Sequence, residues 1–185
     1  MAPLQIEIHG YAIVSDDDRI ADSTGATPAS LRNEADWAYF QRELDGADLI
    51  ALGRLGHAAN PNVKNRRRLV LSRAARGLEQ RNDAWWWNPE LAPWRQAMQI
   101  LLPDGGRVAV PGGQAVFDLF LALGYDAFHL SRAHGVLLAG GRYLFAACER
   151  GMSAASVLRD AALSIGDIRT IDAEAGVTLE MWRKL

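Results

Sequence analysis

Val108-Ala-Val-Pro-Gly-Gly-Gln-Ala-Val-Phe117 is the stretch of sequence from which the fold prediction starts. A short apolar run typical of a buried strand leads into two glycines, and a segment of helical character follows. Such a junction presents free backbone N–H groups and the positive end of a helix dipole, and glycines leave no Cβ in the way of a phosphate. The pattern predicts either a phosphate-binding junction or a plain strand-to-helix turn. The GxGxxG spacing of a Rossmann fingerprint and the GKS or GKT of a P-loop are both missing, so neither of those classes fits.

Two further predicted strands end in groups that suit a phosphate. A glycine with an arginine follows one of them, and a hydroxyl with an arginine follows the other. The carboxyl ends of parallel strands gather at one edge of a sheet, where ligands bind, so three such ends together predict a nucleotide site. The residues are Gly53 and Arg54 after the strand at residues 49–52, and Ser72 and Arg73 after the strand at residues 69–71.

The order of the predicted elements indicates an α/β domain with a mainly parallel sheet and a C-terminal antiparallel hairpin. Internal repeats, low-complexity tracts and linkers are not evident, which predicts a single domain over residues 1–185. The predicted strands are residues 4–14, 49–52, 69–71, 108–110 and 127–130, the predicted helices are residues 27–44, 94–102, 114–123 and 152–163, and the hairpin pairs residues 168–171 with 177–182.

Composition excludes several classes of protein. The 185 residues are 49% hydrophobic and 23% charged, which favours a globular domain, and the net charge of −2 gives no basic surface for nucleic acid. The single Cys148 excludes a disulfide framework, and the four scattered histidines lack zinc-ligand spacing, so we expect no metal site. The sequence shows neither a signal peptide nor an apolar run long enough for a membrane helix. We therefore expect a cytoplasmic protein that contacts neither membrane nor nucleic acid.

An acidic residue stands on the predicted helix of residues 27–44. Asp36 and Phe40 are four residues apart and therefore neighbours on one helix face, beside an apolar stripe of Trp37, Phe40 and Leu44 that we expect to face the core. A desolvated carboxylate beside an aromatic ring can bind a ring nitrogen and an amino group with two hydrogen bonds. The alternative is that Asp36 only stabilises the helix N-terminus as a first-turn acid.

Taken together, the segments resemble the dihydrofolate reductase fold family, which includes the reductase domain of riboflavin biosynthesis. The resemblance covers residues 4–145 and rests on the order and spacing of six regions. It implies a three-layer α/β sandwich and a reduced nicotinamide cofactor, NADPH. The regions are residues 11–21, 35–40, 48–54, 68–72, 108–113 and 126–131.

The resemblance also implies roles for individual residues. Asp36 would anchor the pterin ring and support protonation of its C=N nitrogen, Phe40 would stack on the substrate, and Ser131 would hydrogen-bond the Asp36 carboxylate. Ala12 would lie beneath the ring, and Arg66 would hold an acidic substrate tail. The residues implied in NADPH binding are Ile20, Gly53, Arg54, Leu55, Ser72, Arg73, Gly112, Gly113, Gln114, Ala115 and Val116.

The sequence departs from the family pattern at three places. Leu31 replaces a tryptophan five residues before the helix carboxylate, Gly56 replaces a hydroxyl residue, and the loop of residues 22–29 lacks a proline–tryptophan signature. We predict an NADPH-dependent reductase of a dihydrofolate or dihydropterin heterocycle, a monomer or a homodimer. Two alternatives stay open: a reductase of 5-amino-6-(ribosylamino)uracil in riboflavin biosynthesis, and a non-catalytic nucleotide-binding domain.

Three consecutive tryptophans, Trp85-Trp86-Trp87, lie between the strand at residues 69–71 and the helix at residues 94–102. They form either an extra core strand or a segment with one exposed indole. An exposed indole there would serve as the adenine-side wall of a cofactor groove or as a dimer contact.

Overall fold

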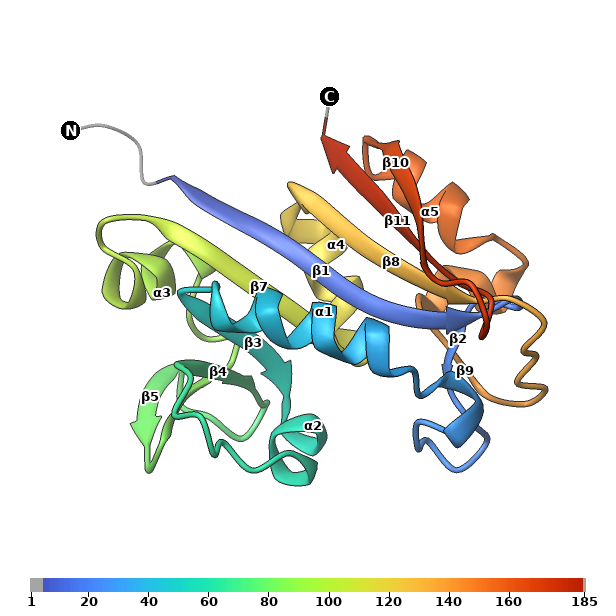
Figure 1. Cartoon of the computed structure of the whole chain (residues 1–185). Helices are drawn as coiled ribbons and strands as arrows, with labels where there is room; N and C mark the ends of the chain where they lie inside the picture. Colours follow the sequence, from blue (N-terminus) through green and yellow to red (C-terminus); the bar gives the residue numbers. More distant parts are fainter. Residues whose placement is uncertain (1–4, 185) are drawn as a thin grey trace.

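The structure, a computed structural model, describes residues 5–184 and is built on a nine-stranded sheet with helices on both faces (Figure 1). No helix in that range is long and apolar enough to cross a membrane. The strands are β1 (Ile6–Ser15), β2 (Arg19–Ala21), β3 (Leu49–Gly53), β4 (Arg68–Leu71), β5 (Leu78–Arg81), β6 (Ala84–Trp87), β7 (Gly106–Gly112), β8 (Ala127–Ala133), β9 (Arg142–Tyr143), β10 (Leu163–Asp172) and β11 (Val177–Lys184). The helices are α1 (Glu34–Asp45), α2 (Arg54–Ala59), α3 (Trp94–Leu101), α4 (Gln114–Leu123) and α5 (Ala154–Asp160), with 3-10 turns at Ala29–Leu31 and Ala146–Arg150.

The large sheet has the strand order β10-β11-β8-β1-β7-β3-β4-β6-β5. Every neighbouring pair from β8 to β6 is parallel, whereas β11 pairs antiparallel with β8, β10 with β11, and β5 with β6. The mainly parallel sheet and its C-terminal hairpin are therefore confirmed. A separate two-stranded sheet pairs β2 with β9.

The two larger of the three hydrophobic clusters in residues 5–184 lie on opposite faces of the sheet. On one face, Leu44 and Phe40 of α1 pack on β1, β3, β4 and β7, with Tyr11 and Ile50 among their neighbours. On the other face, α3, α4 and α5 cover a larger core that includes Phe117. Helix, sheet and helix thus form the three-layer sandwich that the sequence predicts.

The helix predicted over residues 27–44 begins later than expected. Its first part is a 3-10 turn, and Asn33 then adopts an extended conformation and caps α1 by accepting a hydrogen bond from the Asp36 N–H at 3.0 Å. The same Asn33 side chain donates to Asp172 at 2.7 Å, which ties the cap to the end of β10. A competing side-chain-to-backbone bond of this kind explains why the helix starts at Glu34.

The tryptophan run forms an extra strand, β6, which pairs with β4 in parallel. Trp87 is 1% exposed and donates from its indole nitrogen to the Ala92 carbonyl at 2.8 Å. Trp85 and Trp86 are half-buried on opposite cores. The prediction for Trp37, in contrast, is wrong: this side chain is 57% exposed because the buried face of α1 runs through Asp36, Phe40 and Leu44 instead.

Candidate functional site

The carboxyl ends of β3, β4 and β7 bring predicted phosphate-binding residues to one edge of the sheet. Gly53 pairs with Leu71 of β4, and Leu52 pairs with Gly112 of β7. A Cβ added at Gly53 would lie 3.4 Å from the Val116 side chain, so the first turn of α4 sits directly beside β3. Three segments that are far apart in sequence therefore meet there.

Strand β7 passes into α4 through the Gly112–Gly113 junction. Gly112 has a φ of +97°, and a Cβ there would overlap the Phe117 ring; the peptide bond to Gly113 is cis. Gly113 is exposed, and a Cβ there would meet nothing within 4 Å, so the space in front of it is open. Its carbonyl accepts the Val116 N–H at 2.9 Å and begins α4.

The N-terminus of α4 is free to receive an anion. Within residues 5–184 no side chain caps it. The N–H groups of Gln114 and Ala115 belong to the first turn, where a helix has no internal acceptors for them. The Gln114 side chain turns away and donates to Glu149 at 3.1 Å. The first turn of α4 thus combines unpaired donors, a helix dipole and an open glycine approach.

Of the other predicted cofactor residues, Arg54, Leu55 and Arg73 have exposed side chains, whereas Ser72 and Ile20 are half-buried. Arg54 and Leu55 open α2 and are exposed, Leu55 by 69%. Arg73 is also exposed, and its nearest carboxylate is Glu90 at 3.9 Å. The Ser72 hydroxyl accepts the N–H of Ala74 and shapes the turn after β4. Both guanidinium groups are therefore available to a ligand, and the remaining residue, Ile20, packs half-buried against the larger core.

Asp36 occupies the first turn of α1 and faces the sheet. Burial raises the pKa of Asp36, and an interaction with the Ser131 hydroxyl opposes that rise. Ser131 lies on β8, 1% exposed, between Ile13 of β1 and Leu179 of β11. The structure therefore brings together the carboxylate and the hydroxyl that the resemblance implied as a pair.

Aromatic rings continue the site along α1. Phe40 lies one turn beyond Asp36, with its ring 6.2 Å from Tyr11 and 5.8 Å from the exposed Trp37. Ala12 lies on the adjacent β1, but its side chain packs on the larger core across the sheet. The structure thus gathers Asp36, Phe40 and Ser131 on one face and places the Ala12 side chain on the other.

Arg66 is held at the opposite end of α1. Its guanidinium donates to Asp45 at 2.9 and 2.5 Å and to the Gln41 side chain at 2.7 Å. Lys64 also donates to Asp45, at 2.9 Å. The arginine predicted to hold an acidic substrate tail is therefore paired within the chain.

A buried polar cluster that the sequence did not predict lies beneath α1. The Tyr39 hydroxyl contacts Nδ1 of His129 at 2.5 Å, His129 Nε2 lies 3.4 Å from His9, and the Tyr11 hydroxyl donates to Glu43 at 3.0 Å. Burial lowers the pKa of His129 to about 3. The signal that could have revealed this cluster is the spacing of Asp36, Tyr39 and Glu43, which puts three polar side chains on one helix face.

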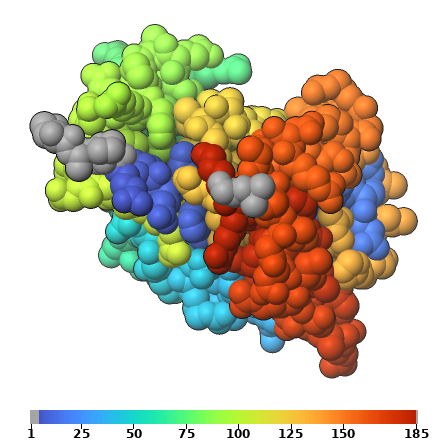
Figure 2. Space-filling model, turned by 90° about the horizontal axis from the view of Figure 1, so that it is seen from above, coloured from blue at the N-terminus to red at the C-terminus, as the bar shows by residue number. Residues whose placement is uncertain are grey.

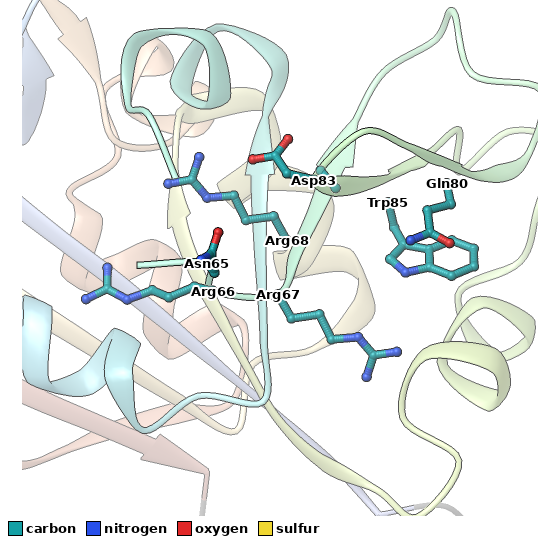
Figure 3. Close-up of a pocket in the computed structure, with 8 residues that line it drawn as sticks. Asn65, Arg66, Arg67, Arg68, Gln80, Asp83 and Trp85 are labelled. Atoms are coloured by element: carbon teal, nitrogen blue, oxygen red, sulfur yellow. The ribbon is translucent and has the colours of Figure 1, made fainter. Parts of the chain in front are cut away.

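A cavity of about 470 Å³ lies elsewhere, where β4 and β6 begin (Figure 3). Asn65, Gln80 and Trp85 line it together with three arginines, which point in different directions. Arg68 is buried beside Asp83 and donates to the Asn60 carbonyl at 2.7 Å. Since β4 and β6 are parallel to β3 and β7, this cavity is at the amino edge of the sheet, away from Asp36 and Gly113.

Comparisons with known proteins add the fold family. No protein-family model matches the chain, and no curated protein is similar to it in sequence. A dihydrofolate reductase from Enterococcus faecalis, solved in complex with NADP(H), matches with a TM-score of 0.67 at 14% identity over 97% of each chain.

Two longer proteins match as well. The deaminase and 5-amino-6-(5-phosphoribosylamino)uracil reductase of Thermotoga maritima has a TM-score of 0.69 at 15% identity, and RibD of Acinetobacter baumannii has 0.71 at 16%. Each match covers 98% of this chain but only 57% and 58% of those chains, respectively. The chain therefore has the dihydrofolate reductase-like fold.

Proposed function

We propose that this chain is an NADPH-dependent reductase that adds hydride to a C=N bond of a pterin-type heterocycle. The observation that carries the proposal is the half-buried carboxylate of Asp36, which lies with Ser131 and Phe40 on the α1 face of the sheet. Support also comes from the Enterococcus faecalis neighbour, which has the same fold and was solved with NADP(H).

The residues around Gly113 fit a dinucleotide phosphate. The uncapped first turn of α4 offers donors, and the open space at Gly113 admits the ligand. Arg54 and Arg73, both exposed near the ends of β3 and β4, suit the additional phosphate of NADPH. When bound, NADPH would supply the hydride.

The chain's own residues would then hold and polarise the substrate. Asp36 would accept two hydrogen bonds from a ring N–H and an amino group, and Ser131 would hold that carboxylate in place. The negative charge of this carboxylate would stabilise the protonated form of the bound ring, so it would favour protonation of the C=N nitrogen. Phe40 would cover the ring and exclude water.

A second candidate is the reduction of a ribosylamino-pyrimidine. The pairing of Arg66 with Asp45 and Gln41 favours it, because this arginine is not free to hold an acidic tail. The Thermotoga maritima and Acinetobacter baumannii proteins have the fold in common with this chain. Asp36 and Phe40 favour the pterin instead, since a pterin offers adjacent donors on a flat ring.

The test combines a substrate panel with one pair of variants. NADPH oxidation is followed by absorbance with dihydrofolate, a tail-free dihydropterin and the ribosylamino-pyrimidine. We expect Asp36→Asn to keep NADPH affinity and to lower turnover by about 10²-fold or more. Glu34→Gln removes the other first-turn acid of α1, which is exposed, and is the matched control.

The outcomes separate the candidates. Turnover of a pterin that depends on Asp36 but not on Glu34 supports the proposal. Equal and small effects of the two substitutions would mean that Asp36 acts only as a helix-terminal charge. Turnover of the pyrimidine alone selects the second candidate, and tight NADPH binding without any turnover selects a non-catalytic domain.

A further inference from the structure

Strand β10 forms one outer edge of the large sheet (Figure 1). It is ten residues long, and among residues 5–184 its only strand neighbour is β11. Residues 165–170 are exposed, and the C-terminal region appears as the orange-red side of the molecule in Figure 2. An edge of this length offers a row of unpaired N–H and C=O groups to another strand. The other edge, β5, has only four residues.

The middle of β10 carries opposite charges on either side of an isoleucine. Asp167 lies opposite Met181 of β11, and Arg169 lies opposite Leu179. Asp167 and Arg169 form an exposed ion pair at 2.7 Å. Ile168, between them, is 60% exposed and lies on the other face of the strand. Asp167 to Thr170 pair regularly with β11, between two register shifts.

The order Asp167, Ile168, Arg169 is complementary to a second copy of the same strand that runs in the opposite direction. In an antiparallel pair of two copies related by a two-fold axis, the residue on the axis meets its own copy, and its neighbours meet each other's copies. With Ile168 on the axis, Asp167 faces the partner's Arg169 twice, and the two isoleucines touch. With Asp167 or Arg169 on the axis, two like charges face each other, which destabilises the pair.

We propose that β10 is a homodimer interface in which two copies of this chain pair antiparallel about Ile168 and continue the sheet across the two-fold axis. Backbone hydrogen bonds would satisfy the outer groups of both strands. Each Arg169 would lie between the Asp167 of its own chain and the partner's Asp167, so the charges would alternate in sign along the interface between the two β10 strands. The contact of the two Ile168 side chains, next to the 40% exposed Ile165, would remove apolar surface from water.

Charge reversal tests the register of this pairing. The oligomeric state of the full chain is measured by sedimentation over a concentration series, where we expect a dimer. Asp167→Lys and Arg169→Glu should each weaken it by about tenfold or more, because two symmetry-related pairs become repulsive together. The double variant restores both pairs and should return the affinity to within about threefold of the starting value. Arg95→Glu, an exposed change on α3, is the control and should have no effect.

Cysteine cross-linking tests the position of the axis independently. Ile168→Cys places two thiols opposite each other and should give a disulfide-linked dimer under mild oxidation. Ile100→Cys on α3, where the native side chain is 52% exposed, is the matched control and should cross-link far more slowly.

A monomer at the highest soluble concentration would overturn the proposal. So would single reversals that leave the dimer intact, a double variant that stays as weak as the single ones, or equal cross-linking at the two cysteine positions. None of these measurements depends on NADPH or on catalysis, so the result is independent of the proposed function.

Discussion

His129 should make the stability of this protein depend on pH between 7 and 5. The imidazole is 6% exposed, with the Tyr39 hydroxyl at 2.5 Å, the His9 ring at 5.4 Å and the Tyr11 ring at 4.4 Å. Burial is the largest cause of its low pKa, and the neighbouring His9 and the positive charge of Arg107 lower the pKa further. Burial also lowers the pKa of His9, so both histidines favour the neutral form.

The sign and the size of the effect follow from proton binding. The pKa of His129 falls from an ordinary 6.5 to about 3 on folding. Below pH 6.5 the unfolded chain therefore binds a proton that the folded chain does not, so the stability present above pH 6.5 is lost as the pH falls toward 3. For one group this amounts to about 2 kcal/mol between pH 7 and pH 5. Any folded pKa of about 4 or lower gives the same figure at pH 5, since the unfolded pKa then sets it.

Urea unfolding followed by tryptophan fluorescence at the two pH values measures this loss. Tyr39→Phe keeps His129 and should keep the pH dependence. The double variant Tyr39→Phe and His129→Phe removes the imidazole together with the hydroxyl that contacts it, so no buried hydroxyl is left without a partner. Between pH 7 and pH 5 its free energy of unfolding should fall by about 2 kcal/mol less than that of the single variant. Equal losses in the two variants would refute the assignment of this dependence to His129.

Two further predictions concern the glycine junction and the tryptophan strand. Gly112→Ala should destabilise the fold by about 2–4 kcal/mol, because an alanine there has a positive φ and its Cβ overlaps Phe117. Gly113→Ala should unfold in urea like the native chain, but in a titration it should bind NADPH at least about tenfold more weakly. Equal NADPH affinity of Gly113→Ala and the native protein would contradict the phosphate site. Trp87→Ala should cost about 3–5 kcal/mol in urea unfolding and Trp85→Ala clearly less, because only Trp87 is fully buried; similar costs would contradict the packing of β6.

The parallel centre of the fold was predictable because each of its strands carries two sequence signals, an apolar run and a turn that ends it. Runs such as Leu49 to Leu52 are apolar throughout, which only a strand covered on both faces requires. Each run also ends at a glycine or a polar turn, which fixes where the strand stops. The meeting of Gly53 and Gly112 at one edge then follows, because the carboxyl ends of parallel strands gather there, whereas the order of the strands was not predicted.

Of the predicted apolar stripe on α1, Phe40 and Leu44 do face the core, and Trp37 was mispredicted for a physical reason. The side of α1 that faces the sheet includes three half-buried polar residues, Asp36, Tyr39 and Glu43. An apolar pattern assigns such residues to solvent, and the pattern therefore selected Trp37. Each of these polar groups meets a partner from a strand: Ser131, His129 and Tyr11, respectively. The partners of Asp36 and Tyr39 are about 90 residues away in the sequence, so local periodicity cannot reveal them. Strand β5 was missed for another reason: three of its four residues are polar, so it shows no apolar run, and it is stabilised by pairing with the adjacent β6.

The two ends of α1 place different demands on a substrate. At Asp36, burial has removed water from the carboxylate, so ring donors would restore hydrogen bonds that folding took away. At Arg66, about 13 Å along the helix axis, Asp45 already provides them, and an acidic tail could bind only by replacing one ion pair with another. Such an exchange at a partly exposed site gains little free energy. For the proposed reductase, discrimination between substrates would therefore rest on the ring, and the decisive comparison is between dihydrofolate and a dihydropterin that has no tail.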